Sequence, residues 1–417
     1  MSSSIYRIGT ANMYDNALRN LGTRQTNLSN LQENLTSGKR VVRASDDPVS
    51  AAQAERAINR LSRIQTEQRA LETQRNAIAQ AESALGDAVD LAQNFRELVV
   101  NAGSAALTPN DRATIANQLQ GLRDQMVAVA NRKDTNGVPL LGALGSALAP
   151  FLGPLSSSPD YNFDGLPGQA ASSGVTIPGT LDGEAAFMFD PQRDGVYTAG
   201  VSAIPSSRFL NTTAITPVNP SLVTGNNYSI AFSAVGPGAT AGTTTATYTI
   251  TNTTTGVVSA PVTVPDFPSD KPMNVTVASI PGLTFDIKGT PANGDTITLA
   301  PSPSMFSAMD AAIRDIRSAP DSNAAAQAVG QALGNMDIGL ERMHNMRGYA
   351  GELLNRADRI TGDQDKRSVQ LEGDRSRAED LDMIQGISDF QNQQVGYEAA
   401  LKSYAQVQKL SLFNFIS

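Results

Sequence analysis

The chain has no cysteine and no tryptophan, and only one histidine, His344, among its 417 residues. These absences exclude disulfides, thiolate metal sites and His/Cys metal clusters. Aromatic residues make up only 5% of the chain, so its cores must depend on Ala, Leu, Ile, Val and Met, which suits long helices. Because a Walker-type phosphate loop and a nucleophile elbow are also missing, the sequence predicts no catalytic residue, no cofactor and no enzyme activity.

The chain also lacks a strong positive charge and long apolar runs. Its net charge is −8, so it has no cationic footprint for nucleic acid. No apolar run reaches the roughly 18 residues that span a bilayer, which predicts no membrane insertion. Residues 1–7 lack the basic and apolar regions of a cleavable signal peptide. If this protein is exported, we expect a route without such a signal.

Proline is nearly absent from the two ends of the chain. Nineteen of the 22 prolines lie between Val138 and Pro303, and the exceptions are Pro48, Pro109 and Pro320. Proline breaks or kinks a helix, so only the two ends are free to form long helices. The same window holds only 14 of the 72 charged residues and is rich in Ser, Thr, Gly and Asn. The ends and the middle therefore differ in structure.

The ends show the heptad spacing of long packed helices. Asp47 and Pro48 favour a helix start, and the helix that they begin has no further proline before Gly103. About 55 residues of helix would be ~80 Å long. We expect its apolar positions to be buried within the subunit; they recur every seven residues, at Ala57, Ile64, Leu71, Ile78, Leu85, Ala92 and Val99.

The two terminal segments each carry one apolar stripe. Residues 1–45 contain six Lys/Arg and two Asp/Glu (net +4), whereas residues 376–417 contain three and five (net −2). Opposite charges and matching stripes predict an antiparallel pair. Two helices alone bury little core, so we expect neighbouring copies to stabilise the pair. The predicted assembly residues are Leu21, Leu28, Leu31, Leu35, Ile387, Phe390, Tyr397, Leu401 and Tyr404.

The pattern in the middle of the chain predicts short strands. Residues 227–232, 245–250 and 295–299 largely alternate polar and apolar side chains between Gly-, Pro- and Asn-rich turns. Residues 140–179 show no clear pattern. The sequence thus predicts an α+β multidomain protein, in which a long antiparallel coiled coil or helical bundle from both ends carries an inserted all-β, sandwich-like domain. The predicted domains are 1–45 with 376–417, 46–137 with 304–375, and 138–303, with a division of the last near residue 200 left open.

The ends also carry a family pattern. The stretch from Leu35 to Pro48, LTSGKRVVRASDDP, resembles the N-terminal signature of flagellin-like axial proteins, although Thr36 replaces the usual Ser. The family's Arg-x-x-x-Gly-x-x-x-Asn-Arg spacing occurs near the other end. Asp-Asp-Pro and the final QKLSLF resemble the hook–filament junction branch of this family more than flagellin proper. The matching residues are Gly38, Arg40, Asp46, Asp47, Pro48, Arg347, Gly351, Asn355 and Arg356.

The resemblance covers residues 1–137 and 304–417, and it implies a structural, self-assembling subunit of the bacterial flagellum. The terminal helices would form the inner tube, and the β insert would face outward. The subunit would be exported through the flagellar type III apparatus to the hook–filament junction. Implied partners are copies of itself, hook-associated protein 1, flagellin and a cytoplasmic export chaperone that binds the C-terminal helix. A flagellin filament subunit, and a secreted adhesin or binding module on a helical stalk, remain alternatives.

Overall fold

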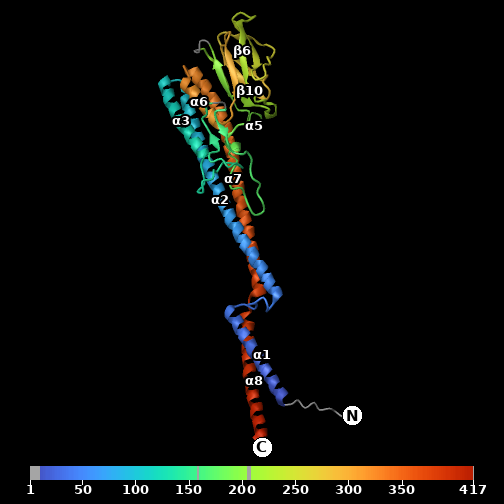
Figure 1. Ribbon diagram of the computed structural model, residues 1–417. Helices are drawn as coiled ribbons and strands as arrows, with labels where there is room; N and C mark the ends of the chain where they lie inside the picture. The colour runs from blue at the N-terminus through green and yellow to red at the C-terminus, as the bar shows by residue number, and fades with distance from the viewer. Residues whose placement is uncertain (1–9, 157–158, 204–207, 417) are drawn as a thin grey trace, which may run out of the picture. The chain divides into compact units, whose positions relative to one another are not determined.

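The computed structural model describes residues 10–156, 159–203 and 208–416, with side chains from residue 15 to residue 406. Within this part of the chain, the long helices come from the two ends (Figure 1). They are α1 (Thr10–Ser37), α2 (Pro48–Ala102), α3 (Pro109–Ala130), α6 (Met305–Ser318), α7 (Ser322–Glu379) and α8 (Met383–Ile416). Shorter turns of helix are α4 (Gly183–Phe187), α5 (Pro191–Asp194) and η1 (Pro220–Leu222).

The three prolines outside the middle window lie where helices begin or are interrupted. Pro48 is the first residue of α2, and Pro109 is the first residue of α3. Thr108 and Asp111 form a capping box there, in which the Asp111 carboxylate accepts from the Thr108 N–H at 2.9 Å. Pro320 lies between α6 and α7. The predicted helix boundaries at these prolines are confirmed.

The chain divides into two compact units. Residues 1–69 with 361–417 form one, which we call the terminal unit, and residues 70–360 form the other, the central unit. Helices α2 and α7 contribute to both, because each is long and unbroken. These boundaries differ from the three predicted domains, whose division remains a prediction. Each unit is described by itself below.

The heptad positions of α2 are buried, as predicted. Ala57 and Ile64 are buried in the terminal unit, and Leu71, Ile78, Leu85, Ala92 and Val99 are buried in the central unit. In the central unit they share a core with α3, α6 and α7. Ion pairs flank that core, with Nε–O distances of 3.1 Å for Arg75–Asp358 and 2.9 Å for Arg96–Asp337. Exposed pairs contribute little energy, so burial along the seam holds the helices together.

The large buried apolar residues of 140–196 pack in this helical core and not in the second core, between the sheets of the middle domain. The described residues of this segment, 140–156 and 159–196, contain two short strands, β1 (Phe151–Leu152) and β2 (Asn162–Phe163), which pair with each other. Its aromatic rings, including Phe151, Tyr161 and Phe187, pack in one cluster with Phe306 of α6. The many alanines of α2 and α6 bury little area, so these rings supply much of the apolar burial.

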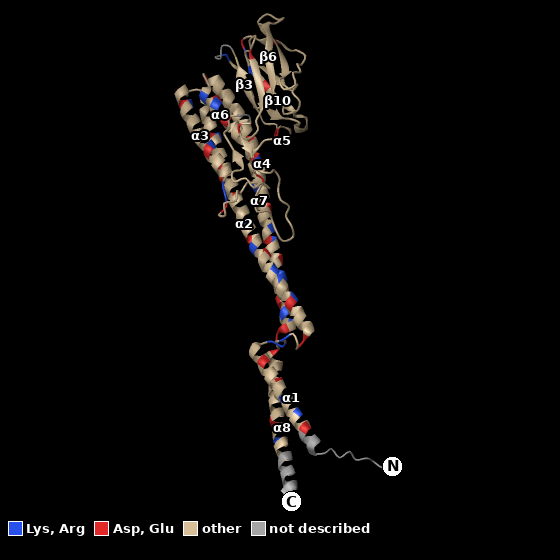
Figure 2. Cartoon of the chain, viewed as in Figure 1, with Lys and Arg blue, Asp and Glu red and all other residues tan. Residues whose placement is uncertain are grey.

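The β domain proper begins at Tyr197, where a second hydrophobic core starts. One sheet has the antiparallel order β3-β11-β6-β7-β8; the other has β4-β10-β5, with β9 also on β10. The core between them contains residues of both sheets, such as Ile230 and Ile287, and few charges occur on these strands (Figure 2). The predicted sandwich-like domain is confirmed. The strands are β3 (Tyr197–Ser202), β4 (Leu210–Thr212), β5 (Thr216–Pro217), β6 (Tyr228–Pro237), β7 (Thr243–Asn252), β8 (Val262–Pro268), β9 (Met273–Val277), β10 (Leu283–Gly289) and β11 (Thr296–Pro301).

Three buried amides on successive turns of α7 hold the β domain. The side-chain oxygen of Gln327 accepts from the Thr212 N–H at 2.6 Å, and the amide of Gln331 donates to the Thr213 carbonyl at 2.6 Å. The amide of Asn335 donates to the carbonyl of Tyr197 at 3.2 Å. Buried polar groups stabilise a structure only when they are paired. These contacts therefore fix where the sandwich sits on α7.

Candidate assembly site

Helices α1 and α8 pair in the antiparallel sense, as predicted. Gly386 near the start of α8 lies beside Leu35 near the end of α1, where an added Cβ would come within 3.2 Å of Leu35 Cδ2. Ten residues further along α8, a Cβ on Gly396 would come within 2.8 Å of Arg24 Nη1. The glycines of α8 therefore permit a close approach of the two helices.

The seam between α1 and α8 is only partly covered. The four predicted leucines of α1 (Leu21, Leu28, Leu31 and Leu35) and the predicted aromatics of α8 (Phe390, Tyr397 and Tyr404) are half-buried. Ile387 and Leu401 remain 46% and 42% exposed. Gly386, Gln393 and Ala400 occupy the covered positions in their place. The prediction missed these three because it followed the largest apolar residues, whereas close packing selected small or flexible ones.

A second apolar stripe on α8 lies outside this seam. Ile384 is 86% exposed, Val395 is 67% exposed, and Met383 is also exposed. Large apolar side chains gathered on one helix in this way mark a surface that another molecule covers. The role of the nine predicted residues in assembly stays a prediction.

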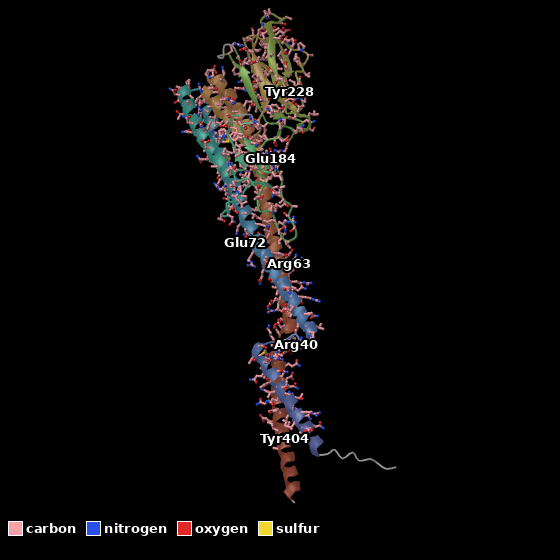
Figure 3. The ribbon with its side chains drawn as sticks, in the orientation of Figure 1. Arg40, Arg63, Glu72, Glu184, Tyr228 and Tyr404 are labelled. Atoms are coloured by element: carbon pink, nitrogen blue, oxygen red, sulfur yellow. The ribbon has the colours of Figure 1, made fainter. Side chains whose placement is uncertain are left out.

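The family-like segment between α1 and α2 connects the two chain segments, 1–69 and 361–417, that make up the terminal unit. Gly38 has φ +71°, the left-handed conformation that ends α1, and its carbonyl accepts from the Leu381 N–H at 2.9 Å. Lys39 forms an ion pair with Glu379. The Arg40 guanidinium donates to the Asp47 carboxylate at 3.2 Å and to the Ala378 carbonyl at 2.9 Å (Figure 3). Arg40 therefore connects the start of α2 to the end of α7.

The two aspartates have different local partners. Asp46 closes the linker, because its carboxylate accepts from the N–H of Val42 at 3.2 Å and from that of Arg43 at 2.8 Å. Asp47 caps α2, accepting from the N–H groups of Val49 and Ser50 at 3.2 and 3.1 Å. Hydrogen bonds from Ser50, and to a lesser extent from Arg40, lower the pKa of Asp47 to about 2. The predicted helix start at this pair is confirmed.

This lowered pKa gives a titration that can be measured. We expect the Asp47 carboxyl to titrate near pH 2 in the folded chain, because its pKa is lowered from the ordinary value of 3.8 to about 2. Because the folded pKa is the lower one, the stabilisation is present above about pH 4 and is lost as the pH falls toward 2. Carbon-detected NMR titration checks the value, and Ser50→Ala should raise it. A pKa near 4 in the native chain would show that the cap is not formed.

The C-terminal family-like residues lie on α7 in the central unit. Arg347 donates to Glu82 of α2 at 2.6 Å, and Arg356 donates to the Ser173 carbonyl at 3.2 Å. Gly351 and Asn355 lie on the surface, and a Cβ on Gly351 would meet nothing within 4 Å. Packing within the chain accounts for the two arginines. It does not require a glycine at Gly351.

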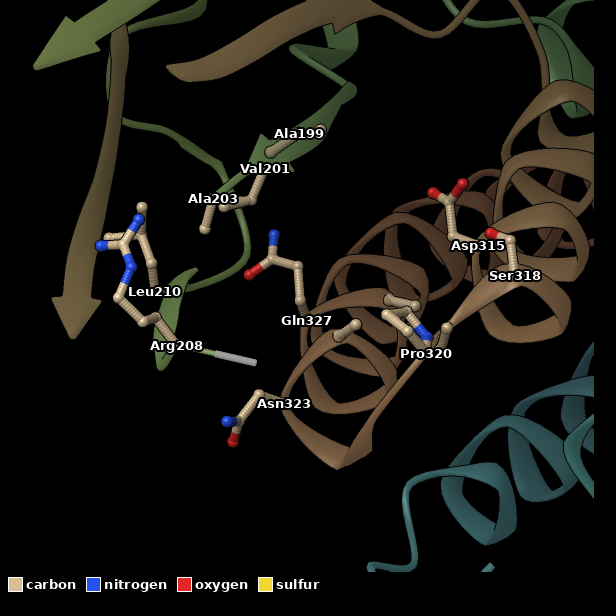
Figure 4. Close-up of a pocket in the computed structure, with 14 residues that line it drawn as sticks. Ala199, Val201, Ala203, Arg208, Leu210, Asp315, Ser318, Pro320, Asn323 and Gln327 are labelled. Carbon is tan, nitrogen blue, oxygen red and sulfur yellow. The ribbon is translucent and has the colours of Figure 1, made fainter. Parts of the chain in front are cut away.

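A cavity of about 240 Å³ lies where the edge strand β3 faces the corner between α6 and α7 (Figure 4). Ala199, Arg208, Asp315 and Gln327 are among its lining residues. The described residues contain no group of three or more His, Asp or Glu side chains placed to hold a metal ion. They also contain no helix that is long and apolar enough to cross a membrane. No pattern in the sequence predicts this cavity, because three separate segments form it.

Comparison with known proteins agrees with this architecture. Residues 8–144 match the bacterial flagellin N-terminal helical region. This match covers about a third of the chain. Flagellar hook-associated protein 3 of Salmonella typhimurium is 35% identical over 149 residues, which are 35% of this chain and 46% of that protein. Flagellin of Clostridium tyrobutyricum is 30% identical over 129 residues, or 31% and 34% of the two chains. The chain therefore matches less than half the length of these curated relatives.

A solved structure shares the fold. Flagellar hook associated protein-3 from Legionella pneumophila superposes with a TM-score of 0.60, at 21% identity, over 76% of this chain and 98% of that one. The likeness supports the arrangement of helical ends around antiparallel sheets.

Proposed function

We propose that this flagellin-like chain is a structural subunit of the flagellum that joins the hook to the flagellin filament. The observation that carries the proposal is the half-covered pair of α1 and α8. The leucines and aromatic residues of its seam are at best half-buried, and a second stripe containing Ile384 and Val395 faces solvent. Neighbouring copies in a tube would cover both surfaces. The chain ends would then fold fully only as they assemble.

A junction role is favoured over a filament role by the relatives. The match to hook-associated protein 3 is longer and more identical than the match to the Clostridium flagellin. The partners that follow are copies of the chain, hook-associated protein 1 on the hook side and flagellin on the filament side. Before export by the type III apparatus, a cytoplasmic chaperone would hold α8, whose exposed apolar stripe would otherwise aggregate.

The proposal predicts that charges on the exposed stripe of α8 block assembly. The double variant Ile384→Glu/Val395→Glu should fold and be exported, yet leave cells without filaments, because it places carboxylates in the buried contact. Asn392→Glu, an exposed position of the same helix that lies to the side of this stripe, is the matched control and should swim. Electron microscopy and motility assays provide the readout. Normal filaments in the double variant would exclude this stripe from assembly, as would normal swimming after deletion of residues 381–417.

Localisation separates the two flagellar roles. A tagged junction protein should give one spot at the base of each filament, whereas a flagellin would label the filament along its length. If the chain were an adhesin on a stalk, neither labelling pattern would be expected. Removal of residues 197–303 would then abolish binding and leave motility unaffected.

A further inference from the structure

A cationic groove runs between α2 and α7 in the terminal unit. Two adjoining cavities of about 360 and 330 Å³ share Arg60, Leu371 and Asp374 in their walls. Arg56 lines the first cavity, and Arg63 lines the second. Buried Ala57 and Ile64 contribute apolar surface to the walls. The groove therefore combines an apolar floor with a row of guanidinium groups.

Pairing within the chain leaves most of this charge uncompensated. Five arginines line the groove: Arg56, Arg60, Arg63, Arg367 and Arg377. The carboxylate that lines it, Asp374, already pairs with Arg377, and Arg63 pairs with Glu67 one turn along α2. Among the residues that the structure describes, no carboxylate pairs with Arg56, Arg60 or Arg367. An ordinary solvated helix surface would show mixed charges here.

An acidic face of matching spacing lies on α2 in the central unit. Asp90 and Glu97 are exposed and seven residues apart, so they share one side of the helix (Figure 3 draws the side chains of α2). Glu72 lies 18 residues before Asp90 on the same side. Neighbouring carboxylates are already paired, Glu82 with Arg347 and Asp87 with Arg132. In the described chain, these three acids have no cationic partner of their own.

We propose that the cationic groove of one copy binds the acidic face of α2 in a second copy. Arg56 and Arg63 are also seven residues apart, so both charge pairs span about 10 Å of helix at 1.5 Å per residue. Arg63 would exchange its exposed pair with Glu67 for a carboxylate of the second copy. The groove and the face are different surfaces of the chain, so the contact is heterologous. Such a contact propagates from copy to copy into a ring or a helical array.

The charges on the two surfaces determine which surface binds and in which register. The apolar floor of the groove contributes buried area to the contact. Exposed ion pairs add little affinity in salt, but wrongly matched like charges are strongly disfavoured. The contact should therefore weaken as ionic strength rises. The proposal rests on the proposed function, because it requires copies that lie side by side in an assembly.

A charge swap in the full-length chain tests the contact. The groove variant is Arg56→Glu/Arg63→Glu, and the face variant is Asp90→Arg/Glu97→Arg. All four side chains are exposed, so circular dichroism and export into the medium should match the native chain. We expect isolated flagella to contain at least about tenfold less of each variant than of the native chain. The chain that carries all four changes should recover most of the retention, because the charges match again.

The possible outcomes separate this inference from the proposed function. Native retention of either two-site variant, or no recovery in the four-site chain, would overturn the contact. If only the groove variant loses its retention in flagella, the groove binds an acidic partner other than a second copy. That result too would overturn the proposal. If the native chain itself is absent from flagella, the proposed function fails instead. Glu67→Gln, which frees Arg63 from its local partner, is the matched control and should be retained.

Discussion

Replacing Phe306 by alanine should lower the free energy of unfolding of the central unit by about 3–5 kcal/mol. The Phe306 side chain is fully buried, with ring centroids 5.2 Å from Tyr161, 5.4 Å from Phe187 and 5.6 Å from Phe151. These rings join α6 to the segment 140–196, in a core that otherwise contains many alanines. The cavity left by the ring could close only if three other aromatic side chains moved together.

Urea unfolding followed by circular dichroism measures this loss. Val100→Ala is the matched control, because Val100 lies on α2 but is 50% exposed, and its loss should stay within about 0.5 kcal/mol. A Phe306→Ala variant as stable as this control would show that the aromatic cluster does not hold the segment. Phe306→Leu should fall between the two, because it retains most of the apolar volume.

Removing Asp310 should cost about 3 kcal/mol, because the buried Arg123 cation would keep only the exposed Asp124 as a carboxylate partner. The Arg123 side chain is only 7% exposed, and its guanidinium lies 3.0 Å from the Asp310 carboxylate. The Tyr161 hydroxyl donates to the same carboxylate at 2.8 Å. Burial raises the pKa of Asp310, against the opposing effects of Tyr161 and Arg123. Burying this carboxylate therefore costs free energy, and the contacts with Tyr161 and Arg123 offset that cost.

The double variant Arg123→Met/Asp310→Leu distinguishes the effect of removing the whole ion pair from the effect of removing one partner. An apolar pair of similar size removes both charges, so we expect it to recover most of the stability that Asp310→Ala loses. Asp315→Ala, on the same helix with an exposed partner in Arg314, should change stability by less than about 0.5 kcal/mol. Thermal and urea unfolding measure all three variants. If Asp310→Ala behaves like Asp315→Ala, Arg123 does not need its carboxylate.

The helices and their partners were largely predictable. The seven heptad positions of α2 are all buried, and helix starts follow Pro48 and Pro109. These features are local, since a helix face and a cap depend on residues within a turn or two. The antiparallel pairing of α1 with α8 also followed from charge and apolar spacing.

The segment 140–196 was not predictable. Its apolar residues have neither helical nor strand spacing, because they are positioned by contact with α3 and α6 and not by their own backbone. Tyr161 illustrates the difficulty, since its hydroxyl partner Asp310 lies 149 residues away in sequence. The amides of Gln327, Gln331 and Asn335 had a visible four-residue spacing, but a polar stripe on a helix ordinarily faces solvent. Only the docked sandwich shows why these residues are polar and buried.

The sequence by itself determined which parts of the chain could be helix, because proline placement and heptad spacing act through the local backbone. It also determined the family pattern between Leu35 and Pro48. Tertiary structure alone decided that Gly386, Gln393 and Ala400 line the α8 seam while Ile387 faces outward. It likewise decided that arginines from α2 and α7 line one groove. The physical reason is that helix contact depends on close approach between distant segments, which no spacing along a single segment records.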